Sequence, residues 1–249
     1  MPEPLRTGPL EELRLDIMAC SRCPLSQERN QAVPGQGPSA AKIVLIGEAP
    51  GLNEDRVGLP FVGKSGKRLD QWLDRAGINR DDCFVTNVLK CKPPRNRFPR
   101  EGDSRWKPYF PPHECWHWLE QQLQAINPLA VVLFGRAALQ YVLLEGSVEM
   151  ADPVTPWIGR FCRRRDKFGE VRFGVSFHPS YILRSKNPYE ENRCLDALLA
   201  VRSYVDAMEA GRAAPVEDLY EIRAAAPIQY QRRLRLFGGP PPTQPQDEQ

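Results

Sequence analysis

The sequence lacks a long apolar run, and histidine is scarce. Its best apolar stretch, which starts at Ala130, is interrupted by Arg136 and Gln140, so no segment reaches the roughly 18 apolar residues of a membrane span. The first residues, Met1–Arg6, contain no apolar h-region, so we expect no secretory signal and a cytoplasmic protein. With only three histidines in the chain, any histidine chemistry is confined to a few positions.

What is present is the composition of an ordinary globular protein. The 249 residues are 41% hydrophobic and 26% charged, enough for one large α/β domain or two small ones. The 25 prolines are about twice the usual share and predict long irregular loops. Seven cysteines in a chain expected to remain in a reducing compartment favour metal binding or redox chemistry over disulfides.

Positive charge is concentrated in two segments, although the net charge is only +3. From Lys90 to Cys115, seven Lys/Arg stand against three Asp/Glu, and from Arg160 to Lys186, eight stand against two. Such segments suit a partner with a phosphate backbone, such as a nucleic acid. Two solvated surface loops would have the same composition.

Short apolar runs alternate with helical spacing along the chain, which predicts a parallel sheet wrapped by helices. The predicted strands are Lys42–Ile46, Cys83–Asn87, Ala130–Phe134 and Val171–Phe177. The predicted helices are Pro9–Cys20, Gly63–Ala76, Glu114–Ile126, Arg136–Leu144 and Pro188–Ala210. We expect residues 1–211 to form one domain, followed by an extension over residues 212–249. In the extension, Glu217–Ala226 predicts a short helix and Phe237–Gln249 a disordered tail.

Polar motifs follow three of the four predicted strands. The Gly47–Gly51 turn follows the first strand, Asn87 closes the second, and His178 follows the fourth. Because ligands of open α/β sheets bind outside the carboxyl ends of the strands, these segments are expected to converge on one pocket. Each alone is more typical of a turn or a structural residue, so their convergence carries the prediction.

Four cysteines provide a second indication of function, a candidate metal site. Cys20 and Cys23 have chelate spacing, and Cys91 and Cys115 are separated by 23 residues. Four thiolates can close a tetrahedral zinc site or hold an iron–sulfur cluster, and spacing does not choose between them. Simple free thiols are the alternative. Cys83 lies in an apolar strand and is expected to be a buried hydrophobic residue.

Taken together, these motifs resemble the uracil-DNA glycosylase superfamily, specifically its iron–sulfur-containing family 4. The resemblance extends from Cys20 to Arg184, about two thirds of the chain, and its blocks occur in the family's order. The matching blocks are Gly47–Gly51, Glu54–Asp55, Gly58–Gly63, Asn87–Pro94 with Asn96–Arg97, Phe134–Arg136 and His178–Arg184.

The resemblance implies a three-layer α/β/α sandwich around a central four-stranded parallel sheet. It implies a monofunctional DNA-repair enzyme that hydrolyses the glycosidic bond of uracil in DNA and leaves an abasic site. The cysteines that match the ligands of the family's [4Fe-4S] cluster are Cys20, Cys23, Cys91 and Cys115. In the family that cluster is structural or positions DNA, and does not cleave the bond.

The resemblance also assigns residues to the base. Such an enzyme must flip the base out of the stack and read its Watson–Crick edge. Phe61 would stack on uracil, the Asn87 amide would pair with uracil O4 and N3–H, and Glu54 would fill the space near C5. Gly47 and Ala49 belong to the turn that would hold the base. Cytosine presents the opposite hydrogen-bonding pattern and would leave the buried amide unpaired.

Two residues are expected to act on the bond. His178 would donate to uracil O2 as negative charge develops there, and Glu48 would orient or activate the attacking water. In the best-known branch of the superfamily an aspartate occupies the position of Ala49. Family 4 enzymes generally lack that carboxylate, so its absence here agrees with the resemblance to family 4.

The sequence departs from the family at the Phe98–Glu114 segment, which is longer than usual. A related branch carries a Lys-Arg-Arg-Ile-His loop there, whose histidine bonds covalently to DNA, and this segment has no such string. Basic and aromatic residues in it suit contact with DNA, or the segment covers the cysteines. A catalytically quiet or cross-linking relative, and a zinc-dependent binding module, are the alternative functions. We expect a monomer that acts on uracil-containing DNA, with no membrane partner and with a tail available to a repair or replication partner.

Overall fold

A single sheet forms the centre of the protein. The computed structural model describes residues 8–100, 102–106, 110–143, 154–166, 169–212 and 219–222. The strands are β1 (Ile43–Gly47), β2 (Cys83–Asn87), β3 (Ala130–Phe134), β4 (Phe161–Asp166), β5 (Gly169–Ser176) and β6 (Leu219–Ile222), in the order β2-β1-β3-β5-β4-β6. The first four strands in this order are parallel, β4 is antiparallel to β5, and β6 is parallel to β4.

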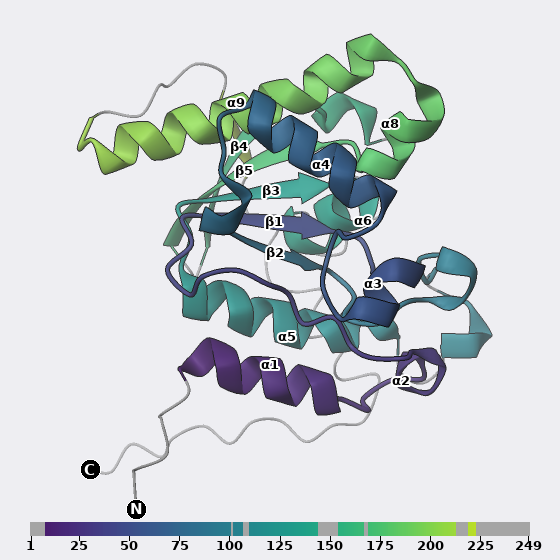
Figure 1. The fold of residues 1–249 in the computed structure, drawn as a ribbon. Coiled ribbons are helices and arrows are strands. Elements are labelled where there is room, and N and C mark those ends of the chain that lie inside the picture. The colour runs from purple at the N-terminus through teal and green to yellow at the C-terminus, as the bar shows by residue number, and fades with distance from the viewer. Residues whose placement is uncertain are drawn as a thin grey trace, which may run out of the picture.

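Helices cover both faces of the sheet. The α-helices of the described residues are α1 (Pro9–Ala19), α2 (Leu25–Glu28), α3 (Leu52–Val57), α4 (Lys64–Arg75), α5 (Pro111–Ile126), α6 (Arg136–Ala138), α8 (Pro179–Ser185) and α9 (Pro188–Glu209). In Figure 1, α4, α8 and α9 lie on one face, α5 covers the other, and α1 packs beneath α5. The predicted α/β/α sandwich is confirmed. None of the described helices is long and apolar enough to cross a membrane.

The four predicted parallel strands are present because their apolar runs are covered on both sides. Every residue of β1, β2 and β3 is buried, which is the pattern of a parallel strand between two helical layers. Two further strands extend the sheet beyond the expected four. β4 has the sequence FCRRRD, with no continuous apolar run, so periodicity did not reveal it.

The predicted helix Glu217–Ala226 is wrong at Leu219–Ile222, which form β6 instead. Hydrogen bonding to β4 holds this segment extended, and tertiary pairing overrides a weak local propensity. The rest of that predicted helix, and the predicted tail Phe237–Gln249, lie outside the described residues.

Helix boundaries follow local stereochemistry. α5 begins three residues before the predicted Glu114 because Pro111 fits the first helical position, where no N–H bond is needed. The predicted helix Arg136–Leu144 is instead the short α6 followed by a π-helical turn over Leu139–Leu143. The short helices α2, α3 and α8 were not predicted.

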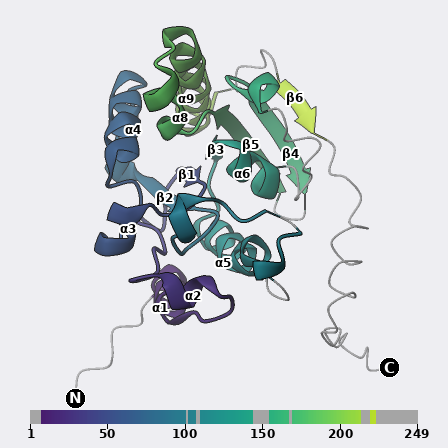
Figure 2. The ribbon, with the colours of Figure 1, turned by 90° about the vertical axis from the view of Figure 1, so that its right-hand side faces the viewer.

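The parallel register brings the strand ends to one edge of the sheet. Gly47 at the end of β1 pairs with Asn87 at the end of β2, and Phe134 at the end of β3 pairs with Ser176 at the end of β5. Glu48, Gly135 and His178 follow close behind these positions. Figure 2 faces this edge, where α3 and α6 also lie. The sequence motifs therefore meet where they were expected to converge.

Candidate active site

Gly47 lies between the two residues expected to hold the base. A Cβ atom added to Gly47 would lie 2.4 Å from Asn87 Oδ1 and 2.5 Å from Phe61 Cζ. The missing side chain therefore leaves room only for close packing of the Asn87 amide and the Phe61 ring.

Phe61 is held in an unusual conformation. Its φ is 53°, in the left-handed region that is rare for a bulky residue. Its ring stacks on the His178 ring, with centroids 5.8 Å apart, and meets Phe134 edge-on at 6.0 Å. Arg80 donates to the Pro60 carbonyl at 3.0 Å, and a Cβ at Gly66 would lie 1.7 Å from the Phe61 carbonyl oxygen. Backbone strain of this kind occurs most often at functional sites, and here the surrounding packing fixes it.

Asn87 presents a buried amide without a protein partner. The residue is 2% exposed, and none of the hydrogen bonds within the described parts of the chain uses its side-chain oxygen or nitrogen. Neither atom is among the fully buried polar atoms without a partner, so the amide keeps a slight contact with solvent. Its backbone carbonyl is engaged and accepts from Lys90 Nζ at 2.9 Å. A buried amide that has no internal partner can bind a ligand that offers one donor and one acceptor.

His178 caps the start of α8, and this contact selects its tautomer. The Ser180 N–H donates to His178 Nδ1 at 3.2 Å, and Ser180 Oγ lies 2.8 Å from the same nitrogen. A neutral ring whose Nδ1 accepts a hydrogen bond carries its proton on Nε2. Burial lowers the pKa of His178, so the neutral ring is favoured. The ring therefore has an Nε2–H donor to offer.

Glu48 belongs to the turn after β1. Its side chain lies beside His178 and near Gly135 and Ala137, at the start of the segment that follows β3. Its Oε1 is 3.4 Å from the Ala137 N–H, and a Cβ at Gly135 would lie 2.6 Å from that oxygen and 3.1 Å from His178 Cβ. The Leu89 N–H donates to the Glu48 carbonyl at 3.0 Å, which joins the turn after β1 to the segment after β2. Both residues expected to act on the bond are thus close together.

Glu54 is a loop anchor in this structure. Its carboxylate accepts from the N–H groups of Gly51 at 3.1 Å, Val62 at 2.9 Å and Gly63 at 2.8 Å, and so ties the start of α3 to the residues after Phe61. The Gly51 N–H is thereby used internally and is not available to a base.

The residue next to Glu54 connects α3 to the cysteine region. Asp55 is 1% exposed, and its carboxylate accepts from the backbone N–H of Asn30 at 3.0 Å and from Asn30 Nδ2 at 2.7 Å. Ala49, in the turn after β1, is half-buried and packs against a small core that contains Cys23, Cys91 and Cys115. The turn and α3 therefore both adjoin the cysteines.

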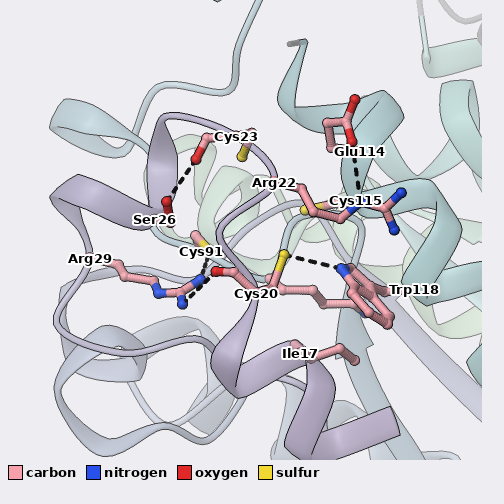
Figure 3. Close-up of a pocket in the computed structure, with 11 residues that line it drawn as sticks. Ile17, Cys20, Arg22, Cys23, Ser26, Arg29, Cys91, Glu114, Cys115 and Trp118 are labelled. Atoms are coloured by element: carbon pink, nitrogen blue, oxygen red, sulfur yellow. Dashed lines mark hydrogen bonds and ion pairs between the residues drawn. The ribbon is translucent and has the colours of Figure 1, made fainter. Parts of the chain in front are cut away.

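The four cysteines line one cavity between α1 and α5 (Figure 3). Cys20 follows α1, Cys23 precedes α2, Cys91 follows β2, and Cys115 belongs to α5. Two sulfurs accept from nearby donors: Arg29 donates to Cys91 Sγ at 2.9 Å, and Trp118 Nε1 donates to Cys20 Sγ at 3.3 Å. The expected convergence of these four residues is thus seen in the structure.

Burial disfavours the charged thiolate form of three of the four cysteines. It raises the pKa of Cys23 to about 11 and also raises the pKa values of Cys91 and Cys115. Such thiols need positive charge to become ligands. No group of three or more His, Cys, Asp or Glu that could hold a metal ion is found among the described residues. A single zinc ion would need its sulfurs about 2.3 Å from one centre, whereas a multi-iron cluster spreads its ligands over a wider frame.

Sequence reasoning missed several residues of this region. Lys90 is 1% exposed although lysine is almost never buried, and only its place between Asn87 and Cys91 could have marked it. Trp106, in the segment that departs from the family, is 4% exposed and belongs to the core that holds the cysteines. Ser180 lies within the His178–Arg184 block, where no pattern marked it, but it fixes the tautomer of His178.

Comparisons with known proteins agree with this geometry. The model of the uracil DNA glycosylase superfamily matches residues 34–199. The Type-4 uracil-DNA glycosylase of Sulfurisphaera tokodaii is 36% identical over 179 residues, 72% of this chain and 77% of that protein. The Type-4 enzyme of Thermotoga maritima is 32% identical over 193 residues, 76% of this chain and 91% of its own. A Type-5 enzyme of Pyrobaculum aerophilum is 31% identical over 126 residues, 45% of this chain and 52% of that protein. The chain belongs to the uracil DNA glycosylase superfamily, within its type-4 branch.

Proposed function

We propose that this protein excises uracil from DNA by hydrolysing the bond between the base and deoxyribose. The observation that carries the proposal is the Asn87 amide, largely buried and without a hydrogen bond to the described residues, which lies across Gly47 from the Phe61 ring. A structural asparagine at this depth would be paired internally. Type-4 uracil-DNA glycosylases are relatives over most of the chain, which supports uracil as the base.

Base recognition follows from the chemistry of the amide. Asn87 Nδ2 would donate to uracil O4 and Oδ1 would accept from uracil N3–H, while the flipped base stacks on Phe61. Cytosine offers a donor and an acceptor in the reverse order, so it would leave the buried amide unpaired at a cost of about 1–3 kcal/mol for each group. Glu54 contributes by anchoring the loop of Phe61, and this anchoring would set the wall of the pocket near C5.

Bond cleavage leaves negative charge on the departing uracil, mainly at O2. The Nε2–H of a neutral His178 would donate to that oxygen as the charge develops, and the Ser180 N–H holds the ring in the required tautomer. Glu48 lies beside His178 and is the carboxylate that would orient the attacking water. With no lysine nucleophile at a position that matches the family, the product would be an intact strand with an abasic site.

The four cysteines are proposed to hold a [4Fe-4S] cluster. The residues fit this group, since all four line one cavity whose wall also carries the cationic side chains of Arg29 and Lys90. Such a cluster would supply positive metal charge to buried thiols and cross-link α1 to α5, and it has no part in bond cleavage. Iron analysis and the visible absorbance of purified protein test this, and colourless protein with stoichiometric zinc after anaerobic preparation would remove it.

The setting of the reaction follows from the same proposal. The exposed cations Arg95, Arg97, Arg136 and Arg184 come from segments that leave the carboxyl edge of the sheet, where they would contact phosphates. We propose that the protein acts as a monomer in the cytoplasm, where its seven cysteines would remain reduced. We also propose that residues 212–249 bind a repair or replication partner.

The test is excision from an oligonucleotide that contains one uracil, either single-stranded or opposite guanine. Alkali-dependent cleavage of the product, absent in His178→Ala, would establish a monofunctional glycosylase. A protein–DNA adduct that survives denaturation would instead indicate the cross-linking alternative. If folded, iron-loaded protein leaves the strand intact under alkali, uracil excision is wrong and a DNA-binding role is favoured.

A further inference from the structure

Lys90 is a fully buried cation with three hydrogen-bond acceptors. Its Nζ donates to Thr86 Oγ1 at 2.7 Å, to the Asn87 carbonyl at 2.9 Å and to Gln122 Oε1 at 2.8 Å. The side chain is 1% exposed. The three donors of the ammonium group are therefore all used, and the group has one defined position.

The acceptors of Lys90 are themselves fixed. Thr86 Oγ1 and Gln122 Nε2 both donate to the Pro34 carbonyl, at 3.1 Å and 2.7 Å. The Val33 N–H donates to the Lys90 carbonyl at 2.7 Å. This network joins the end of β2 to α5 and to the segment before β1. Movement of the ammonium group would therefore disturb the main chain at Asn87.

Lys90 also lines the cysteine cavity, together with Cys91 and Cys115. Three acceptors around Nζ fit the ammonium form, although burial opposes the charge and lowers the pKa of Lys90 to about 7. The hydrogen bonds of Lys90 therefore place a positive charge in the wall of the cysteine cavity.

We propose that Lys90 is a positioning residue that couples the cysteine site to the base pocket. It holds the main chain of Asn87, so that the amide faces the base, and it supplies a positive charge to the wall of the cluster cavity. This inference rests on the proposed function, because it assigns Lys90 a role in uracil excision and beside a cluster. The contacts of Lys90 thereby link the cysteine site to Asn87, the residue proposed to recognise the base.

The test compares Lys90→Met with Lys92→Met in the iron-loaded full chain. Methionine keeps most of the length and volume of lysine but has no charge and no donor. Lys92 is half-buried and two residues further along the chain, so it controls for loss of one positive charge nearby. Three quantities are measured: the single-turnover excision rate on a single-stranded uracil oligonucleotide, the Kd for the same oligonucleotide under conditions that prevent turnover, and the reduction potential of the cluster.

For Lys90→Met we expect an excision rate about tenfold lower, the effect of losing one charge-assisted hydrogen bond to the pocket. The Kd for DNA should change less than about twofold, because Lys90 does not reach the surface. The reduction potential should become more negative, since loss of a nearby positive charge disfavours the added electron. Lys92→Met should match the wild type in all three.

The inference is overturned if Lys90→Met excises uracil at the wild-type rate, or if its reduction potential is unchanged. If Lys90→Met does not accumulate as folded protein, Thr86→Val tests the same network without changing the charge. This variant should excise several-fold more slowly with an unchanged potential, and a wild-type rate would overturn the coupling. Failure of the proposed function is a separate result, because then the wild type itself excises nothing while the shift in potential still reports on Lys90.

Discussion

At the scale of single residues, Gly47 makes a sharp prediction because no side chain fits there. A methyl group at Gly47 would lie 2.4 Å from Asn87 Oδ1 and 2.5 Å from the Phe61 ring. Gly47→Ala should therefore push the two apart and lower the single-turnover excision rate by about a hundredfold or more. Gly8→Ala is the matched control, since nothing lies within 4 Å of a Cβ at Gly8. Equal rates for both variants would show that the base does not bind at Gly47.

His178→Ala removes the proposed donor to uracil O2. Loss of one such donor typically costs a factor of about 10² to 10³ in rate, and the affinity for DNA should be almost unchanged because the residue is largely buried. Single-turnover kinetics and a binding assay on the same oligonucleotide check the two parts separately. If rate and affinity fall together, His178 serves binding, and the role assigned to it is wrong.

The protonation of His178 is a separate prediction. Burial lowers its pKa below the ordinary value of 6.5, so the folded protein should keep a neutral ring with the proton on Nε2 at pH 6.5. Nitrogen NMR of labelled protein, assigned by comparison with His178→Gln, measures the tautomer directly. Because the unfolded chain is protonated more readily, the stability from this residue is present above about pH 6.5 and is lost as the pH falls. A ring that is already charged at pH 6.5 would contradict the proposed tautomer.

At the scale of elements, the segment that departs from the family contributes to the core. Trp106 lies in the short helical turn Ser104–Trp106 and is 4% exposed in the core shared with Cys91 and Cys115. Trp106→Ala should lower the free energy of unfolding by about 3–5 kcal/mol, as for other buried aromatic residues. Urea denaturation measures the change, with exposed Arg100→Ala as a control that should stay within about 0.5 kcal/mol. An unchanged stability in Trp106→Ala would mean that the segment is only a surface loop.

The sequence predicted elements best where burial is strong. Ala130–Phe134 is a continuous apolar run and is the strand β3 to the residue, because both of its faces are covered. β4 and β6 escaped prediction because their stability comes from pairing with a neighbouring strand and not from an apolar pattern. The short helix α3 also escaped, since six residues are too few for a periodic signal.

At the scale of the whole molecule, the cysteine site is expected to stabilise the fold. Cys91→Ala should yield protein with little iron, no visible absorbance and a lower Tm, because the remaining buried thiols and Lys90 lose their compensating charges. Cys83→Ala is the control, since Cys83 is equally buried but lies in β2 away from the cavity, and it should keep its iron. Calorimetry and iron analysis check both variants. A Cys91→Ala protein with full iron content would remove Cys91 from the ligand set.

Much of the candidate site was also within reach of the sequence. The convergence of Gly47, Asn87 and His178 follows from parallel strands and from the rule that their carboxyl ends share an edge. What the sequence does not contain is the conformation of Phe61 or the burial of Lys90. Both depend on contacts between segments far apart in the chain, such as the one between Lys90 and Gln122.

The hydrogen bonds between buried Asp55 and exposed Asn30 have a consequence for how this branch of proteins can diverge. Asp55 fastens the chain near the cysteines to the helix whose Glu54 holds the loop of Phe61. The part of the fold that carries the cysteines is thus tied to the part that is proposed to read the base. In a relative that has lost the cysteines, the hydrogen bonds that join Asp55 to the chain near them would no longer be needed. We therefore expect descendants without the cysteines to have replaced Asp55 and Asn30 together, as a compensated double change, and not one at a time.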